Sequence, residues 1–167
     1  MELEPIEGPE LELKAAFSWN QRTGSEDANL RLGTARTIAA FANTAGGQLR
    51  IGYDDHGNAV GIEQELRALF DHDFLDQFEQ LLHEYLKRTL FPYPFRAYDV
   101  SFRKSHESWV CTIDVKPVPT VTYVCQKDDA GELKHLVFVR TGNRTITLTN
   151  LERDRYVVER NGGKWAL

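Results

Sequence analysis

One segment of the chain, residues 34–57, constrains the fold more than any other part of the sequence. Glycines at Gly46-Gly47 supply the positive φ that commonly ends a helix. Residues 49–53 then alternate between apolar and other side chains, as expected for a strand, and an acidic turn follows at residues 54–57. The exit of this strand is therefore a candidate position for functional side chains. Before the glycines, apolar residues at three- and four-residue spacing predict a helix with one apolar stripe: Ala35, Ile38, Ala39, Ala42 and Ala45.

The 167 residues are most simply one domain and are enough to bury a hydrophobic core. No apolar run approaches the roughly 18 residues that a membrane span needs, and the acidic N-terminus does not resemble a signal peptide. We therefore expect a cytoplasmic protein with no membrane partner. The two cysteines, Cys111 and Cys125, lie in apolar strand-like contexts and are expected to be buried, reduced thiols.

The net charge of −5 argues at first against a nucleic-acid partner, but the charges are unevenly distributed. Residues 1–12 hold five acids and no base, which leaves 20 acids and 20 bases in the rest of the chain. Residues 63–84 carry seven acids against one base, whereas residues 85–167 carry fourteen bases against nine acids. This polarity permits a local basic face.

The remaining periodicity predicts further strands and helices. Residues 11–16 alternate as an opening strand, and residues 98–115 form a hairpin. Residues 74–86 keep helical spacing, with Asp71 or Asp73 available as the cap. Further short elements are expected at residues 59–62, 136–140 and 149–160.

Helices and strands are mixed along the chain, and the hairpins favour antiparallel pairing, so the predicted fold class is α+β. We expect a mixed, mostly antiparallel sheet with about three packed helices. The domain would span residues 1–160, with an acidic leader at residues 1–9. Residues 161–167 would form a C-terminal tail.

Three acidic residues, Glu7, Glu12 and Asp55, are candidates for a metal site. Clustered carboxylates bind Mg²⁺ or Mn²⁺ through oxygen, and such ions activate water or stabilise charge during phosphodiester cleavage. Lys14 lies two residues after Glu12 on the same side of the strand, where it would neutralise a phosphate or pair with a carboxylate. A solvated acidic tail and a turn-forming Asp pair explain the same acids without any chemistry.

Four arginines form a second candidate set. Arg36 and Arg50 flank the small-residue segment, and Arg140 and Arg144 bracket residues 141–143. Glycine and asparagine permit a tight turn that presents N–H groups there, and neighbouring arginines would hold a phosphate. The alternative is an ordinary loop with surface arginines.

Other motifs argue against some kinds of chemistry. No Gly-Lys-Ser/Thr follows the glycines near residue 46, so the segment is no Walker loop and no nucleotide cofactor is expected. The five histidines lack the spacing of metal ligands and are expected at the surface.

Several short blocks occur in order along nearly the whole chain. The block from Phe41 to Gly47, Phe-Ala-Asn-Thr-x-Gly-Gly, is quite specific, and a late Val-Arg-x-Gly element supports it. With these blocks the sequence resembles the Schlafen-type AlbA domain family, long described in bacteria as a DNA-binding domain. The blocks are Glu12-Leu13-Lys14, residues 40–47, residues 51–55 with Gly57 and Gly61, and Phe138-Val139-Arg140 with Gly142, Asn143 and Thr145.

The resemblance implies an α+β domain that binds RNA or DNA. In the vertebrate Schlafen ribonucleases, a similar core cleaves structured RNA such as transfer RNA with three acidic residues and a divalent ion. By motif these acids would fall on Glu7, Glu12 and Asp55, with Glu10 competing for the first position. The vertebrate core contains two such lobes and this chain has room for one, so a homodimer would restore the second.

Three functions stand as hypotheses. The leading one is nucleic-acid binding, with contacts from Lys14, Arg36, Arg50, Arg140 and Arg144. The second is a metal-dependent endoribonuclease that uses Mg²⁺ or Mn²⁺ at the three carboxylates. The third is a dimerisation or protein-binding module without nucleic-acid chemistry.

Overall fold

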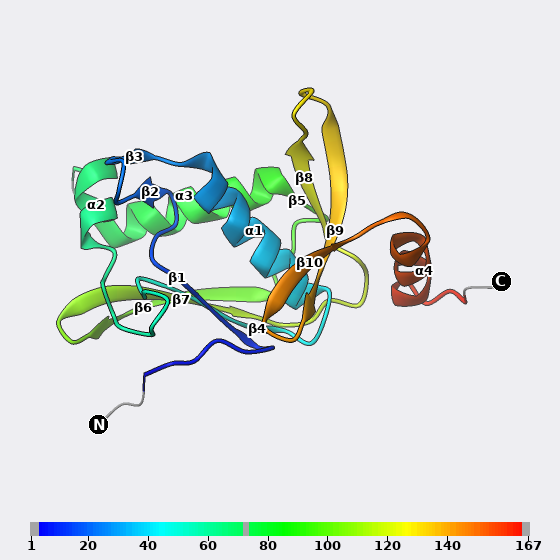
Figure 1. Ribbon diagram of the computed structural model, residues 1–167, viewed down its shortest axis with the longest axis horizontal. Coiled ribbons are helices and arrows are strands. Elements are labelled where there is room, and N and C mark those ends of the chain that lie inside the picture. Colours follow the sequence, from blue (N-terminus) through cyan, green and yellow to red (C-terminus); the bar gives the residue numbers. More distant parts are fainter. Residues whose placement is uncertain (1–3, 72–73, 165–167) are drawn as a thin grey trace.

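Figure 1 shows the computed structural model, which describes residues 4–71 and 74–164. Within these residues the chain forms four α-helices, two four-stranded sheets and one two-stranded pair. Helices and strands are mixed in one α+β unit, which confirms the predicted fold class. The strands divide between two sheets because Pro117 and Pro119 interrupt pairing after the first hairpin, and the chain then enters a second sheet.

The first sheet has the strand order β1-β4-β7-β6, and its pairing is antiparallel except between β1 and β4. The strands in that order are Leu11–Lys14, Gly47–Ile51, Ser108–Val115 and Tyr98–Ser105. Leu49 and Ile51 of β4 are fully buried against the helices, as the predicted alternation requires. The expected strand at residues 59–62 is reduced to one bridge, between Tyr53 and Ala59.

Helices α1, α2 and α3 cover one face of this sheet (Figure 1). Their bounds are Ala28–Ala42, Glu63–Leu69 and Phe74–Thr89. Small side chains let α1 pack close to the sheet, and Asp27 caps it by accepting a hydrogen bond from the Asn29 N–H. The predicted pattern did not include α2, and Asp73, a proposed cap of α3, lies outside the described residues.

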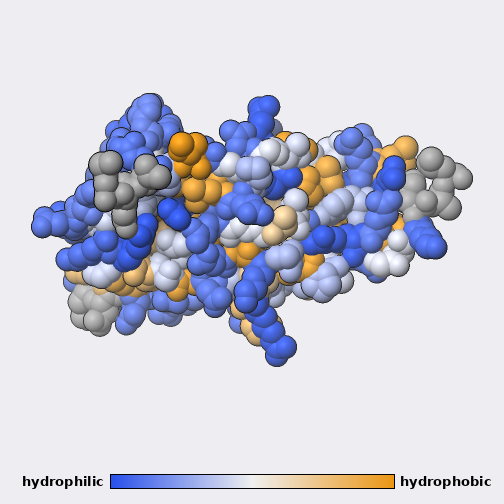
Figure 2. Space-filling model, turned by 90° about the horizontal axis from the view of Figure 1, so that it is seen from below, coloured by the Kyte–Doolittle hydropathy of each residue, from blue (hydrophilic) through white to orange (hydrophobic). Residues whose placement is uncertain are grey.

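The opposite side of the molecule is hydrophilic over most of its surface, with apolar side chains in separate small patches (Figure 2). On this open face of the first sheet, Gln48 donates a hydrogen bond to Asp114 at 2.6 Å. Part of this face is covered, because Leu13, Tyr53 and Val110 form a small buried apolar cluster there, and the part that carries such polar side chains is solvated.

The two glycines after α1 are required by close backbone approach. Gly46 has a φ of +80°, and a Cβ there would lie 2.6 Å from the Val115 carbonyl oxygen. A Cβ on Gly47 would lie 2.6 Å from the Phe41 ring. The predicted helix stop is therefore confirmed, and it also allows β4 to enter the sheet beside β7.

The second sheet has the order β10-β9-β8-β5 and is antiparallel throughout. Its strands in that order are Arg144–Leu148, Leu133–Thr141, Tyr123–Lys127 and Leu90–Phe91. The β8–β9 hairpin projects from the body of the molecule (Figure 1). Helix α4, Asn150–Arg160, packs on one face of this sheet through Tyr156 and Val157.

Asn43 joins α1 to the second sheet. Its side-chain N–H donates to the carbonyls of Thr122 (2.9 Å) and Phe138 (3.0 Å), and its Oδ1 accepts the Thr122 N–H at 2.8 Å. The hydroxyl of Thr44 accepts the backbone N–H of Arg140 at 2.9 Å. Asn43 is fully buried, and buried polar groups in native proteins are hydrogen-bonded. The Phe-Ala-Asn-Thr block is thus the junction between the helical layer and the second sheet.

Two further sequence expectations concern membranes and thiols. Among the described helices, none combines the length and apolar character needed to cross a membrane. Both cysteines are free thiols, as predicted. Cys111 is fully buried, but Cys125 is only half-buried because it lies on the face of the second sheet that α4 covers in part.

Candidate functional site

The three acidic residues singled out from the sequence line one surface pocket of about 630 Å³, which we call the carboxylate pocket. Glu7 comes from the leader, Glu12 from β1 and Asp55 from the turn after β4. The other lining residues are Leu13, Lys14, Ala15, Ala16, Trp19, Asn20, Gln21, Arg22 and Leu30. The structure therefore brings acids from three separate segments of the chain to one pocket.

Parallel pairing of β1 with β4 sets the direction of the β1 side chains. Glu12 is the register partner of Leu49, and Lys14 is the partner of Ile51. Because register partners share a face of the sheet, Glu12 and Lys14 point toward the helical layer, at the edge where β1 ends the sheet. Because β1 is an edge strand, its charged side chains remain partly exposed although they lie on the face that the helices cover.

Asp55 is placed by the turn that its neighbour stabilises. The Asp54 carboxylate accepts the backbone N–H of His56 and of Asn58, both at 2.9 Å, and the Asn58 side-chain amide at 3.0 Å. Hydrogen bonds from the Asn58 side chain and backbone hold the pKa of Asp54 below its usual value. Asp54 thus builds the turn, whereas Asp55 is exposed and lines the carboxylate pocket.

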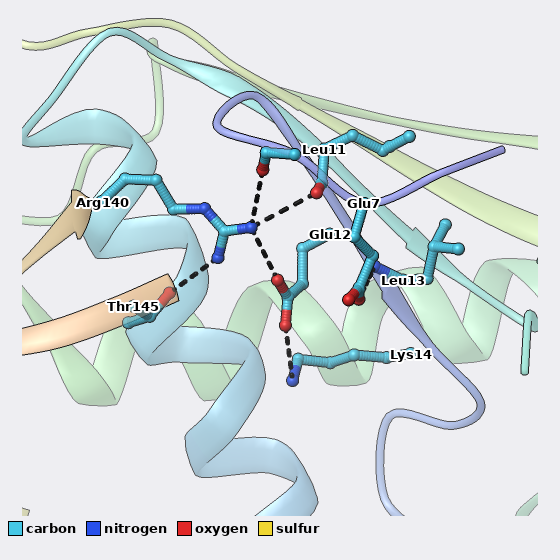
Figure 3. Close-up of polar contacts among 8 residues, drawn as sticks. Glu7, Leu11, Glu12, Leu13, Lys14, Arg140 and Thr145 are labelled. Carbon is cyan, nitrogen blue, oxygen red and sulfur yellow. Dashed lines mark hydrogen bonds and ion pairs between the residues drawn. The ribbon is translucent and has the colours of Figure 1, made fainter. Parts of the chain in front are cut away.

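Glu12 is bound to a buried arginine (Figure 3). Its carboxylate lies 2.8 Å from Nη2 of Arg140 and 3.9 Å from Nζ of Lys14. The Arg140 side chain is only 2% exposed, and it also donates to the Gly8 carbonyl at 2.9 Å and to the Thr145 hydroxyl at 3.1 Å. Arg140 therefore ties the leader and β1 to the β9–β10 hairpin.

The carboxylates have the chemistry of a Mg²⁺ or Mn²⁺ site, but their arrangement is not that of ligands to one ion. Within residues 4–71 and 74–164 there is no group of three or more His, Cys, Asp or Glu side chains that could hold a metal. Glu12 is directed to Arg140 and Lys14, and Oε1 of Glu7 accepts the Leu13 N–H at 3.0 Å. As the side chains lie, they do not fit a shared divalent ion.

The five predicted basic contacts do not converge on one surface. Lys14 is in the carboxylate pocket, and Arg144 is exposed on the β9–β10 hairpin. Arg36 donates to Gln126 of β8 and lies over the Phe138 ring. Arg50 alternates with Leu49 along β4, so it lies on the opposite face of the first sheet.

Arg140 was expected to contact nucleic acid, but its buried position does not suit that role. Its guanidinium packs over the Phe41 ring, with 5.1 Å between Cζ and the ring centroid, and is enclosed by its hydrogen-bond partners. A side chain this deeply buried cannot contact a phosphate while the fold is intact. We therefore assign Arg140 to holding the fold together and leave it out of the proposed interface.

Sequence reasoning missed Glu65 of α2, which holds the segment that leads into the lining residue Trp19. Its buried carboxylate accepts the backbone N–H groups of Phe17 (3.0 Å), Ser18 and Trp19 (3.2 Å). Burial raises the pKa of Glu65 above its usual value, against the effect of these hydrogen bonds. In the sequence Glu65 is one of many acids in residues 63–84, and no local signal separates it from the solvated ones.

The small hairpin of β2 and β3 contributes four lining residues that sequence reasoning also missed: Trp19, Asn20, Gln21 and Arg22. Its strands are Trp19–Asn20 and Ser25–Glu26. Trp19 and the exposed Arg22 both line the carboxylate pocket, so an aromatic ring and a second cation accompany Lys14 there. The polar, glycine-containing sequence around residue 24 did not indicate that this segment would form part of a pocket.

Comparison with solved structures shows a related fold. The crystal structure of the DIP2311 protein from Corynebacterium diphtheriae superposes with a TM-score of 0.52 at 16% sequence identity. The match covers 84% of this chain and 22% of that one, so this chain spans about a fifth of the length of that relative. At this identity the likeness concerns the fold alone.

Comparison at the level of sequence families is more informative. No curated protein matches the chain. A family model described as "Schlafen, AlbA_2" matches residues 7–149, which include β1, the glycine pair and the β9–β10 hairpin. The chain therefore belongs to the Schlafen AlbA_2 family.

Proposed function

We propose that this domain binds nucleic acid and that the carboxylate pocket contacts the bound strand. Membership of the Schlafen AlbA_2 family supports a domain of nucleic-acid-binding type. The observation that carries the proposal is the convergence of Glu7, Glu12 and Asp55 with Lys14 and Arg22 on one pocket. Cations and acids side by side suit a ligand that offers both phosphates and hydrogen-bond donors.

The two kinds of side chain have different parts in this proposal. Lys14 and Arg22 supply the positive charge that pairs with backbone phosphates. Carboxylates cannot bind phosphate directly, but they accept hydrogen bonds from base amino groups and from ribose 2′-hydroxyls. Since DNA lacks the 2′-hydroxyl, this combination favours RNA.

Replacing Lys14 with glutamine should weaken RNA binding about fivefold to tenfold and lower the slope of log affinity against log salt by about one. Fluorescence anisotropy with labelled single-stranded RNA, transfer RNA and duplex DNA, between about 50 and 200 mM salt, measures both quantities. Lys116→Gln is the matched control, because Lys116 is exposed and lies outside the pocket. Absence of salt-sensitive binding by the unaltered protein at tens of micromolar would refute the proposal.

A second candidate function is cleavage of structured RNA, and one observation favours it: the three acids share a pocket. Asp55 is the informative residue, because it is exposed and its replacement does not disturb the Glu12–Arg140 pair. Because Glu12 is paired with Arg140, this candidate function requires the Glu12 carboxylate to leave Arg140 before the acids can share an ion. If it does so, transfer RNA should be cut in Mn²⁺ or Mg²⁺, and Asp55→Asn should reduce the rate by about a hundredfold.

The control for the cleavage assay is Asp129→Asn, the same change at an exposed turn between β8 and β9. Cleavage that continues unchanged in Asp55→Asn would be assigned to a contaminating nuclease or to another site. Measuring the molar mass of the protein in the same solutions tests the predicted homodimer.

A further inference from the structure

A second groove, which we call the hairpin groove, lies along the β8–β9 hairpin and shares no lining residue with the carboxylate pocket. Its volume is about 660 Å³. An adjoining pocket against α4 shares Tyr123 and His135 with it, so the depression continues along the sheet. The hairpin groove is lined by Lys87, Arg88, Leu90, Phe91, Tyr123, Cys125, Leu133 and His135.

Strand register explains the strip of rings and apolar side chains on the floor of the groove. Phe91 is the register partner of Tyr123, and Cys125 is the partner of His135. Tyr123 and Cys125 are two residues apart on β8, so all four side chains lie on one face of the second sheet.

Helix α4 covers only part of this face, where it packs on Val137 and Val139. Beyond the helix, Phe91 is 68% exposed and Leu133 is 58% exposed. Rings and apolar side chains on a sheet face are usually covered, and exposed groups of them commonly mark an interaction site. We therefore expect another molecule, the occupant of the groove, to cover the open part of this face.

The charge of the groove indicates what that occupant is. Lys87 and Arg88 are both exposed and come from the last turn of α3. Among the described residues that line the groove there is no carboxylate, and no described carboxylate forms an ion pair with Lys87 or Arg88. A groove with rings on its floor and cations on its rim complements a polyanion with flat, unpaired bases.

We infer that the hairpin groove binds a short stretch of single-stranded RNA, with bases stacked on Phe91 and Tyr123 and phosphates beside Lys87 and Arg88. The inference rests on the proposed nucleic-acid binding and adds to it a second contact surface and a strand type. A duplex hides its base faces, so the groove should select unpaired strands.

Cys125 gives a direct readout of occupancy. The other cysteine of the chain, Cys111, is fully buried, so a thiol reagent should label the folded protein at Cys125 alone. A saturating RNA single strand of about ten nucleotides should slow alkylation of Cys125 by about fivefold or more, and the corresponding duplex by less than about twofold. Mass spectrometry of the labelled protein measures both rates.

Charge-matched variants locate the effect. The double variant Lys87→Gln with Arg88→Gln should abolish the protection of Cys125 and weaken single-strand affinity about tenfold. The control double variant, Arg96→Gln with Lys116→Gln, removes the same charges from exposed positions outside the groove and should change affinity by less than about twofold.

Each other outcome overturns the inference in a recognisable way. RNA that binds by anisotropy but leaves the alkylation rate unchanged removes the groove from the interface, while the proposed function stands. Equal protection by duplex refutes the strand type. If the alkylation rate of Cys125 falls as the protein concentration rises in the absence of RNA, the groove is an interface between copies of the chain. Lack of any salt-sensitive binding refutes both proposals together.

Discussion

Replacing Arg140 with methionine should lower the free energy of unfolding by about 3–5 kcal/mol, because the change leaves the half-buried Glu12 without its closest partner. The carbonyls of Gly8 and Leu11 also lose a donor. Methionine keeps most of the stem that packs over Phe41, so the loss reflects the charge and the hydrogen bonds more than the volume. Urea unfolding monitored by circular dichroism, with an unchanged m-value, measures the effect.

Arg144→Met is the matched control for this measurement. Arg144 lies four residues further along the same hairpin and is exposed, so its replacement should change stability by no more than about 0.5 kcal/mol. In a double-mutant cycle, Glu12→Gln combined with Arg140→Met should destabilise much less than the sum of the single changes. A loss below about 1 kcal/mol for Arg140→Met would show that the pair does not hold the leader and β1 in place.

Replacing Glu65 with leucine should lower the free energy of unfolding by about 4 kcal/mol. The backbone N–H groups of Phe17, Ser18 and Trp19 would lose their acceptor, and each buried donor left unpaired costs about 1–3 kcal/mol. Phe17 and Ser18 are fully buried, so water cannot replace the carboxylate without opening the structure. Thermal and urea unfolding both report this loss.

The neighbouring Gln64→Leu is the control, because Gln64 is exposed on the same helix and should tolerate the change within about 0.5 kcal/mol. The pKa of Glu65 adds a test of sign. Burial raises it in the folded state, so the folded protein holds this proton more tightly than the unfolded chain. The stability of the protein relative to Glu65→Gln should be highest below about pH 4.5 and fall as pH rises through the folded pKa; a rise over that range would contradict the assignment.

Local periodicity was sufficient for the helix and the strand that lead to Asp55. The alanine spacing before Gly46 predicted α1, and the alternation after it predicted β4, because each pattern depends on side chains only a few residues apart. The same reasoning missed α2, whose seven residues are too few to show a helical period against an acidic background. The prediction of a single sheet was wrong, because the pairing of strands that are distant in the sequence cannot be inferred from a short segment.

The sequence could not distinguish exposed basic side chains from buried ones. Lys14, Arg36 and Arg140 were all candidates for phosphate contact, yet one lines a pocket, one packs on Phe138 and one is buried. The identity of a basic residue gives the charge of its side chain but not the exposure of that side chain. Exposure follows from the packing of the second sheet against α1, which places Arg140 over Phe41.

By itself, the sequence determined the α+β class, the family, the helix stop at Gly46 and the identity of the three acids, all of which depend on local pattern or on motifs. Only the tertiary structure decided that these acids line one pocket, and that Glu12 faces Arg140 and not a neighbouring carboxylate. The physical reason is separation along the chain: Arg140 reaches the Gly8 carbonyl across 132 positions. Such a contact depends on the parallel pairing of β1 with β4 and on the packing of two sheets around α1.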